Sequence, residues 1–158
     1  MAGFSHFDSD GNAHMVDIGD KDVTERLAIA KVSIEMQPET LALIQIGGVK
    51  KGDVLAVAQL AGIMGAKHTP NLIPLCHPLS LTSVAVELTC NAEGNSVDVT
   101  AICKVKGRTG VEMEALTAAS VASLTVYDMC KSVDRSMRIT NLHLTRKTGG
   151  KSGTFEAE

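Results

Sequence analysis

The fold class is decided by residues 81–106, LTSVAVELTCNAEGNSVDVTAICKVK. Apolar and polar residues alternate in both halves of this stretch, which is the pattern of a β-strand with one buried face. Between the halves, residues 92–95 (Ala-Glu-Gly-Asn) have the composition of a turn. We therefore predict an antiparallel hairpin made of strands at 81–91 and 96–106. The buried face of the second strand should present Val97, Val99, Ala101, Cys103 and Val105.

Strand and helix patterns flank this hairpin on both sides. In chain order they predict a strand at 23–36, helices at 38–46 and 52–68, a proline-rich loop at 69–79, a helix at 111–133 and a strand at 138–146. This order predicts an α+β fold with a ferredoxin-like layout, in which helices pack on one face of an antiparallel sheet. We expect one domain over residues 1–158, with irregular segments at 1–20 and 147–158.

Composition narrows the classes of function. Aromatic residues make up 3% of the chain and the net charge is −3, which argues against nucleic-acid binding by stacking or by a basic surface. No stretch approaches the roughly 20 apolar residues of a membrane span. The N-terminal residues do not resemble a signal peptide, and the four cysteines show no paired spacing. We expect a cytoplasmic protein with reduced thiols that binds neither membrane nor nucleic acid.

The segment LIPLCHPL at 72–79 contains a candidate acid–base residue. His77 lies between Pro74 and Pro78, which restrict the backbone on both sides. A histidine that titrates near neutral pH on a rigid loop suits proton transfer. The alternative, that His77 only bonds a backbone carbonyl, stays open. A metal site at Cys76 and His77 is the weakest interpretation, and we predict no metal ligands.

The long helix at 111–133 has carboxylates near both ends. Glu112 and Glu114 lie in its first turn, where the helix dipole alone would favour them. Glu114 nevertheless aligns with Asp128 along an apolar stripe, at three- and four-residue steps. Lys131 follows Asp128 by three residues, so the two should pair. The apolar neighbours predict a partly buried pair able to transfer protons, whereas the alternative is a routine surface pair. Because this helix is apolar almost all round, we expect a second subunit to cover it.

Local groups of cations would have to hold an anionic ligand, since the chain as a whole is acidic. The candidate cations are Arg26, Lys50, Lys51, Lys67, Arg108, Arg146, Lys147 and Lys151. The last two lie in KTGGKSG at 147–153, where glycines let backbone amides approach an anion closely. The spacing is not that of a Walker loop. The alternative is that these cations are only solvated.

Five unbroken motifs together resemble one known family over nearly the whole chain. They are HMVDI at 14–18, KGDVLAVAQLAGIMGAK at 51–67, LIPLCHPL at 72–79, TGVEMEALTAASVASLTVYDMCK at 109–131 and KTGGKSG at 147–153. They resemble the cyclic pyranopterin monophosphate synthases, the MoaC family of molybdenum cofactor biosynthesis.

The resemblance implies a reaction and an assembly. It implies conversion of (8S)-3′,8-cyclo-7,8-dihydroguanosine 5′-triphosphate into cyclic pyranopterin monophosphate, with release of diphosphate. It also implies a homohexamer, a trimer of dimers with active sites at the dimer interface. No cofactor is expected, and whether Mg²⁺ accompanies the triphosphate is open. The alternatives are a non-catalytic nucleotide-binding oligomer and a structural assembly protein.

The resemblance also implies roles for individual residues. The implied catalytic residues are Asp128, Lys131, Lys51 and His77. The implied substrate-binding residues are Leu75, Cys76, His77, Glu112, Met113, Glu114, Arg26, Lys147 and Lys151.

Overall fold

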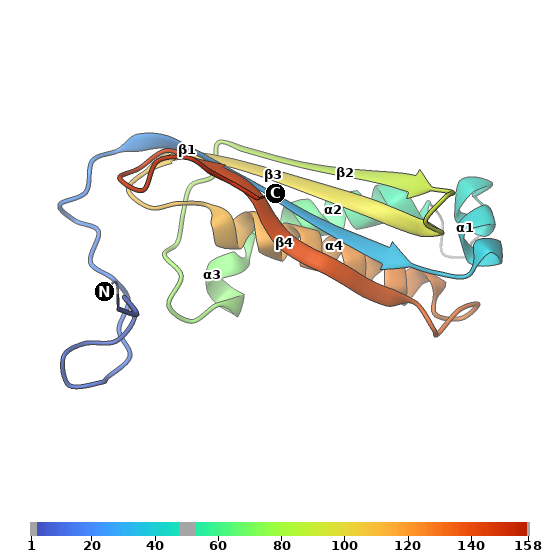
Figure 1. Ribbon diagram of the computed structural model, residues 1–158, viewed down its shortest axis with the longest axis horizontal. Coiled ribbons are helices and arrows are strands. Elements are labelled where there is room, and N and C mark those ends of the chain that lie inside the picture. Colours follow the sequence, from blue (N-terminus) through green and yellow to red (C-terminus); the bar gives the residue numbers. More distant parts are fainter. Residues whose placement is uncertain (1–2, 48–52, 158) are drawn as a thin grey trace.

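The structure is a computed structural model that describes residues 3–47 and 53–157. Its elements are β1 (Thr24–Glu35), α1 (Pro38–Gln45), α2 (Val54–Lys67), α3 (Thr69–Leu72), β2 (Ser83–Asn91), β3 (Ser96–Gly107), α4 (Glu112–Cys130), β4 (Arg138–Thr148) and β5 (Phe155–Glu156). The strands form one layer, and α2 and α4 lie along one of its faces (Figure 1). The predicted α+β fold, with an antiparallel sheet and helices on one face, is confirmed.

The order of the strands matches the predicted ferredoxin-like layout. The sheet runs β2-β3-β1-β4-β5, and each neighbouring pair is antiparallel. Since β1 and β2 both run opposite to the β3 strand between them, α1 and α2 form a crossover connection. In the same way, α4 connects β3 to β4 across β1. The short β5 adds one strand at the edge beside β4.

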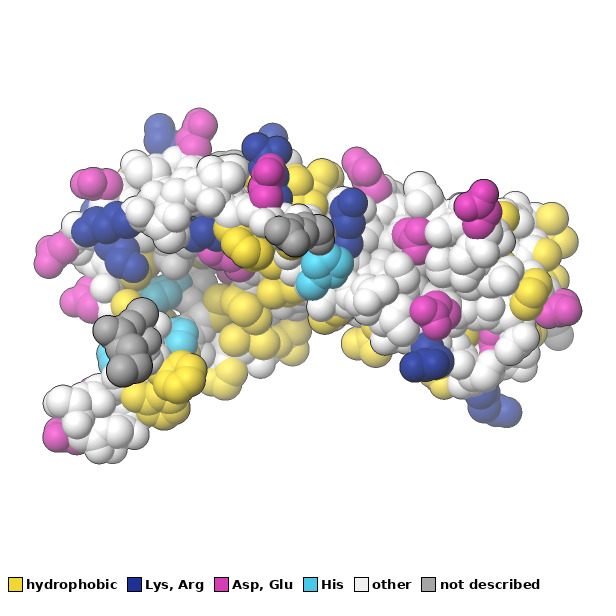
Figure 2. Space-filling view, in the orientation of Figure 1, with side chains coloured by type: hydrophobic (Ala, Val, Ile, Leu, Met, Phe, Trp, Pro, Cys, Tyr) yellow, Lys and Arg dark blue, Asp and Glu magenta, His cyan; other side chains and the backbone are white. Residues whose placement is uncertain are grey.

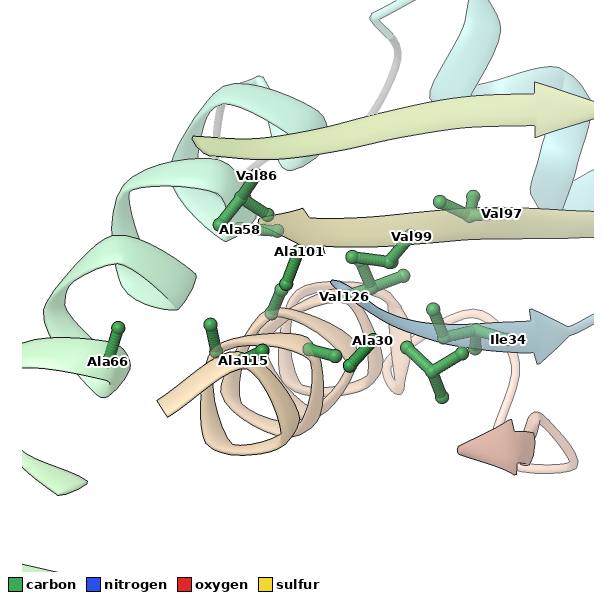
Figure 3. Packing of buried hydrophobic residues seen from close by; sticks show 14 of the residues in the cluster. Ala30, Ile34, Ala58, Ala66, Val86, Val97, Val99, Ala101, Ala115 and Val126 are labelled. Atoms are coloured by element: carbon green, nitrogen blue, oxygen red, sulfur yellow. The ribbon is translucent and has the colours of Figure 1, made fainter. Parts of the chain in front are cut away.

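The core forms where small apolar residues of the sheet meet α4. The predicted inner face of β3 is confirmed, because all five of its residues are at most 3% exposed. Ala30 and Ile34 of the neighbouring strand β1 continue this face, and Ala115 and Val126 of α4 pack against it (Figure 3). At the closest approach of the two helices even alanine would be too large, because a Cβ on Gly65 of α2 would lie 2.8 Å from Val121 Cγ2 of α4. The glycines and alanines therefore allow close packing of two helices on one sheet.

The segment 69–79 is not entirely a loop, so that prediction was wrong at its start. The short helix α3 occupies Thr69–Leu72. Pro70 falls in the first turn of α3, where a missing N–H removes no helical hydrogen bond. The Thr69 hydroxyl donates to the carbonyls of Gly65 and Ala66, which ties α3 to the end of α2.

The tail is also more regular than predicted. The prediction of an irregular segment at 147–158 was wrong at 147–148, which belong to β4, and at 155–156, which form β5. Gly149, Gly150 and Gly153 have positive φ angles that turn the chain back along β4. There it pairs with the unpaired backbone groups of an edge strand.

Asp134, in the connection from α4 to β4, caps the start of α1. The N-cap residue of α1, Gln37, provides no side-chain cap of its own. Instead, Asp134 Oδ2 accepts hydrogen bonds from the Gln37 amide at 2.9 Å and the Thr40 hydroxyl at 3.1 Å. Its Oδ1 accepts from the amide and hydroxyl of Ser136. Burial tends to raise the pKa of Asp134, but these hydrogen bonds outweigh it and lower the pKa from 3.8.

We expect Asp134→Ala to lower the free energy of unfolding at pH 7 by about 1 kcal/mol, the usual value of a cap. Because the pKa is lowered in the folded protein, the carboxylate stabilises it above pH 3.8 and this contribution is lost as the pH falls through the folded pKa. Urea unfolding at pH 7 and pH 3 measures both effects. The difference between variant and wild type should shrink at pH 3, and a difference that is constant with pH would contradict the capping role.

Candidate functional site

The sheet extends beyond the helices at the end where β1 begins. Thr24 and Arg26 lie on the same face of β1 as the buried Ala28, the face that is covered by α4 further along. Here that face meets the first turn of α4, the tail after β4, and an N-terminal arm (residues 3–20) that projects from the sheet (Figure 1). Figure 2 shows a hollow between the arm and the body, with hydrophobic and histidine side chains around it. Two adjoining cavities lie at this end of the molecule.

The first, which we call the carboxylate cavity, has a volume of about 610 Å³. Its walls come from the arm, the 73–79 loop and the start of α4. It gathers six of the residues singled out from the sequence, which are Leu75, Cys76, His77, Glu112, Met113 and Glu114. His6 and Ala13 of the arm also line it, and no local sequence pattern indicated them. Loop and helix are 33 residues or more apart in the chain, so only the fold brings them together.

Glu114 is the chemically most unusual group in this cavity. The residue is 2% exposed, and its Oε1 accepts a weak hydrogen bond from the Cys76 thiol at 3.8 Å. Its Oε2 is buried without any hydrogen-bond partner. Burial, together with the charge of Glu112, raises the pKa of Glu114, although its own amide and Cys76 oppose the shift. A carboxyl group with a raised pKa can accept or donate a proton closer to neutral pH than a solvated one.

Cys76 is a poor candidate for a nucleophile. Burial raises the pKa of its thiol to about 11, and the neighbouring Glu114 contributes to the rise. A thiol with such a pKa stays protonated at neutral pH and serves as a hydrogen-bond donor.

The sequence left open whether His77 lies at a reactive site or only bonds a backbone carbonyl, and the structure shows both a cavity position and such a bond. It lines the carboxylate cavity, and its Nε2 lies 2.6 Å from the carbonyl oxygen of Val16 in the arm. A carbonyl oxygen only accepts, so Nε2 must carry the proton. The hydrogen bond holds the arm against the 73–79 loop and orients the imidazole at the cavity wall.

The second, which we call the cationic cavity, has a volume of about 520 Å³. It brings together Arg26, Lys147 and Lys151, as the sequence suggested, and adds Lys21. Thr109, Gly110 and Glu112 line both cavities, so the two are neighbours. The sequence did not single out Lys21, since a lone lysine before a strand has no distinguishing pattern.

Close contacts hold two of the four cations of this cavity, Lys147 and Arg26, in place. Lys147 Nζ lies 3.3 Å from Glu112 Oε1 and also donates to the Ser152 hydroxyl. Arg26 Nε donates to the Gly107 carbonyl at 3.1 Å. A Cβ on Gly150 would lie 2.2 Å from Arg26 Nη1, so only glycine lets the tail lie directly on this guanidinium. The ion pair Lys147–Glu112 joins the tail to α4 at the boundary between the two cavities.

Asp128 and Lys131 do not line either of these cavities in this chain. Lys131 Nζ lies 2.6 Å from Asp128 Oδ1, so the predicted pairing is present. The pair is not partly buried, however, because the side chains are 58% and 51% exposed. The apolar neighbours in the sequence face the sheet, while Asp128 lies on the opposite side of α4. Fourteen residues separate Asp128 from Glu114, which corresponds to about 21 Å along the helix axis. Lys51 lies outside the described residues.

Within residues 3–47 and 53–157, no three His, Cys, Asp or Glu side chains gather as metal ligands. In the same ranges, no helix combines the length and apolar character that crossing a membrane would require.

Comparison with known proteins places the chain in a family. Three curated relatives are each named cyclic pyranopterin monophosphate synthase. The one from Rhodospirillum rubrum is 64% identical over 98% of this chain and 93% of the relative. The one from Dinoroseobacter shibae is 61% identical over the full length of both, and the one from Cereibacter sphaeroides is 59% identical over 99% of both. The sequence pattern of the MoaC family matches residues 15–150, and the chain therefore belongs to the MoaC family.

Proposed function

We propose that this chain is a cyclic pyranopterin monophosphate synthase of molybdenum cofactor biosynthesis. It converts (8S)-3′,8-cyclo-7,8-dihydroguanosine 5′-triphosphate into cyclic pyranopterin monophosphate and releases diphosphate. The observation that carries the proposal is the pair of adjoining cavities, one with a buried carboxyl group and one with four cations. The names of the full-length relatives agree with this activity.

The two cavities suit the two ends of the substrate. A guanine-derived ring presents several N–H donors, and Glu114 offers an unpaired buried oxygen to accept from them. A triphosphate requires several cations in a fixed arrangement, and Lys21, Arg26, Lys147 and Lys151 surround the neighbouring cavity. We infer that the ring occupies the carboxylate cavity and the phosphates the cationic cavity.

Two kinds of chemistry then have to take place. Opening the purine-derived ring and closing the pyranopterin require proton transfers, for which Glu114 and His77 are in position. Forming the cyclic phosphate requires a ribose hydroxyl oxygen to bond to the α-phosphorus while the bond to the bridging oxygen breaks. The diphosphate that leaves carries additional negative charge, which the surrounding lysines and Arg26 stabilise.

We propose that the active site is completed by a second subunit in a homohexamer built as a trimer of dimers. Within one subunit the Asp128–Lys131 pair is about 21 Å from Glu114 along α4. Two copies of α4 packed antiparallel would bring the pair of one subunit to the cavities of the other. Exposed apolar side chains on the helices support such packing, since Leu60 of α2 and Leu124 of α4 are about 60% exposed.

Mixed oligomers test whether two subunits share a site. We expect co-expressed Lys131→Ala and Glu114→Gln subunits to form dimers in which one site has both changes and the other has neither. Activity should therefore return to a quarter to a half of the wild-type level, although each variant alone is inactive. Mixed oligomers that are as inactive as the single variants would show that each site lies within one subunit.

The expected absence of a transition-metal cofactor is part of the proposal. We propose that turnover needs no bound zinc or iron, and that any Mg²⁺ enters with the triphosphate as part of the substrate. A requirement for zinc or iron that persists after chelation and re-addition controls would contradict it.

We also propose a cytoplasmic location, in keeping with four cysteines that form no disulfide among the described residues.

The decisive experiment supplies the cyclised triphosphate to the purified protein and measures diphosphate release and cyclic pyranopterin monophosphate. We expect stoichiometric formation of both products, and none from GTP, which lacks the second ribose–base bond, between C3′ and C8, of the cyclised substrate. Binding of the cyclised substrate without diphosphate release would instead indicate a non-catalytic nucleotide-binding oligomer.

A further inference from the structure

Two buried side-chain oxygens of the described residues have no hydrogen-bond partner, and each belongs to a residue at one of the two cavities. They are Glu114 Oε2 at the carboxylate cavity and Thr24 Oγ1 at the cationic cavity. A buried polar atom without a partner carries its full desolvation penalty, and native structures rarely tolerate this without a reason. The ring-binding role proposed above accounts for Glu114 but leaves Thr24 unexplained.

The position of Thr24 explains why its hydroxyl has no partner in the protein. Thr24 is the first residue of β1, and it stands opposite Gly107 of β3, which has no side chain to bond. On the same face of β1, the next side chain is Arg26, whose Nε is already bonded to the Gly107 carbonyl. The local fold therefore places a hydroxyl beside the cavity and supplies nothing to satisfy it.

The cavity that Thr24 lines is suited to an anion. Four cations line it against two carboxylates, Asp22 and Glu112, and Glu112 is already paired with Lys147. Lysines attract an anion without a strict direction, whereas a hydroxyl donates along one O–H bond. A phosphate oxygen at this position would gain a directed hydrogen bond in addition to its ion pairs.

We propose that Thr24 is a substrate-binding residue whose hydroxyl donates a hydrogen bond to an oxygen of the phosphate chain. The inference rests on the proposed function and adds a specific contact to it. The proposed contact requires the buried hydroxyl to turn toward the cavity by rotation about the Cα–Cβ bond of Thr24. Because the hydroxyl has no partner where it lies, this rotation breaks no hydrogen bond.

The test uses inorganic pyrophosphate, the leaving group of the proposed reaction, with the intact protein and two variants. Thr24→Val keeps the shape of the side chain and removes the hydroxyl, whereas Thr24→Ser keeps the hydroxyl. By isothermal titration calorimetry, we expect Thr24→Val to bind pyrophosphate about tenfold more weakly or worse, as for the loss of a hydrogen bond to a charged group. Thr24→Ser should stay within about threefold of wild type.

The thermal midpoint without ligand separates binding from structure. Since the hydroxyl has no partner in the free protein, Thr24→Val should unfold at the wild-type temperature or above it. Equal pyrophosphate affinity of the valine variant and wild type overturns the inference, and so does a valine variant that loses stability and affinity together. Turnover of the cyclised triphosphate by the wild-type protein, measured in parallel, decides the proposed function independently of Thr24.

Discussion

Replacing Lys131 by alanine is expected to abolish turnover of the cyclised triphosphate and to leave the oligomer and substrate binding largely intact. Lys131 Nζ lies 2.6 Å from Asp128 Oδ1, so a proton can pass between the two groups. A positioned proton-transfer group typically contributes a factor of about 10² to 10⁴ to the rate. In contrast, an exposed ion pair contributes little to stability, at most about 1 kcal/mol, so the fold should not suffer.

Three measurements check this result. They are the rate of diphosphate release, the affinity for the substrate, and the size of the particle by light scattering. Lys104→Ala is the matched control, because Lys104 is an exposed lysine of β3 outside both cavities. It should retain wild-type turnover. Near-normal product formation by Lys131→Ala would remove this lysine from the mechanism.

Replacing Glu114 by glutamine is expected to change activity and stability in opposite directions. Glutamine has nearly the same shape and can still bond Cys76, but it cannot take up or deliver a proton. If Glu114 transfers protons to or from the ring, the turnover number should fall about 100-fold or more. The free protein should nevertheless become more stable, because the variant no longer buries a carboxyl group that must ionise as the pH rises.

The pH dependence follows from the direction of the pKa shift. Burial raises the pKa of Glu114 in the folded protein. Its contribution to stability is therefore complete at low pH, below the pKa of the unfolded chain, and is lost as the pH rises through the raised folded pKa. Thermal unfolding between pH 5 and pH 9 should show wild type falling progressively below Glu114→Gln. Parallel stability curves, or a variant as active as wild type, would contradict the proposed role.

Together, Glu114 and Thr24 illustrate how this end of the molecule departs from the rest of the fold. Elsewhere in residues 3–47 and 53–157, buried side-chain oxygen and nitrogen atoms have hydrogen-bond partners, as with the four hydrogen bonds to Asp134. At the two cavities, polar atoms are buried and left without partners. Unpartnered buried atoms lower the stability of the free protein, and a bound ligand that satisfies them raises it again. This exchange of stability for binding is characteristic of functional sites.

Local periodicity was sufficient for strands β1 to β4, for the long helix and for the buried side of β3. The alternation at Val97, Val99 and Ala101 reports burial directly, because successive side chains of a strand point to opposite faces. The carboxylate cavity was largely predictable as well, since its six predicted residues come from two continuous motifs. Short-range patterns therefore predict the type of an element and the face of that element on which a residue lies.

The tertiary structure alone decided what depends on segments distant in the chain. It placed Thr24 and Lys21 beside Lys147, capped α1 with Asp134 across 97 residues, and separated Asp128 from Glu114 along a helix. It also showed that the Asp128–Lys131 pair is exposed in the folded chain, whereas the apolar neighbours in the sequence had predicted burial. Burial and the meeting of distant charges depend on how elements pack, and packing is not encoded in the spacing of residues along one element.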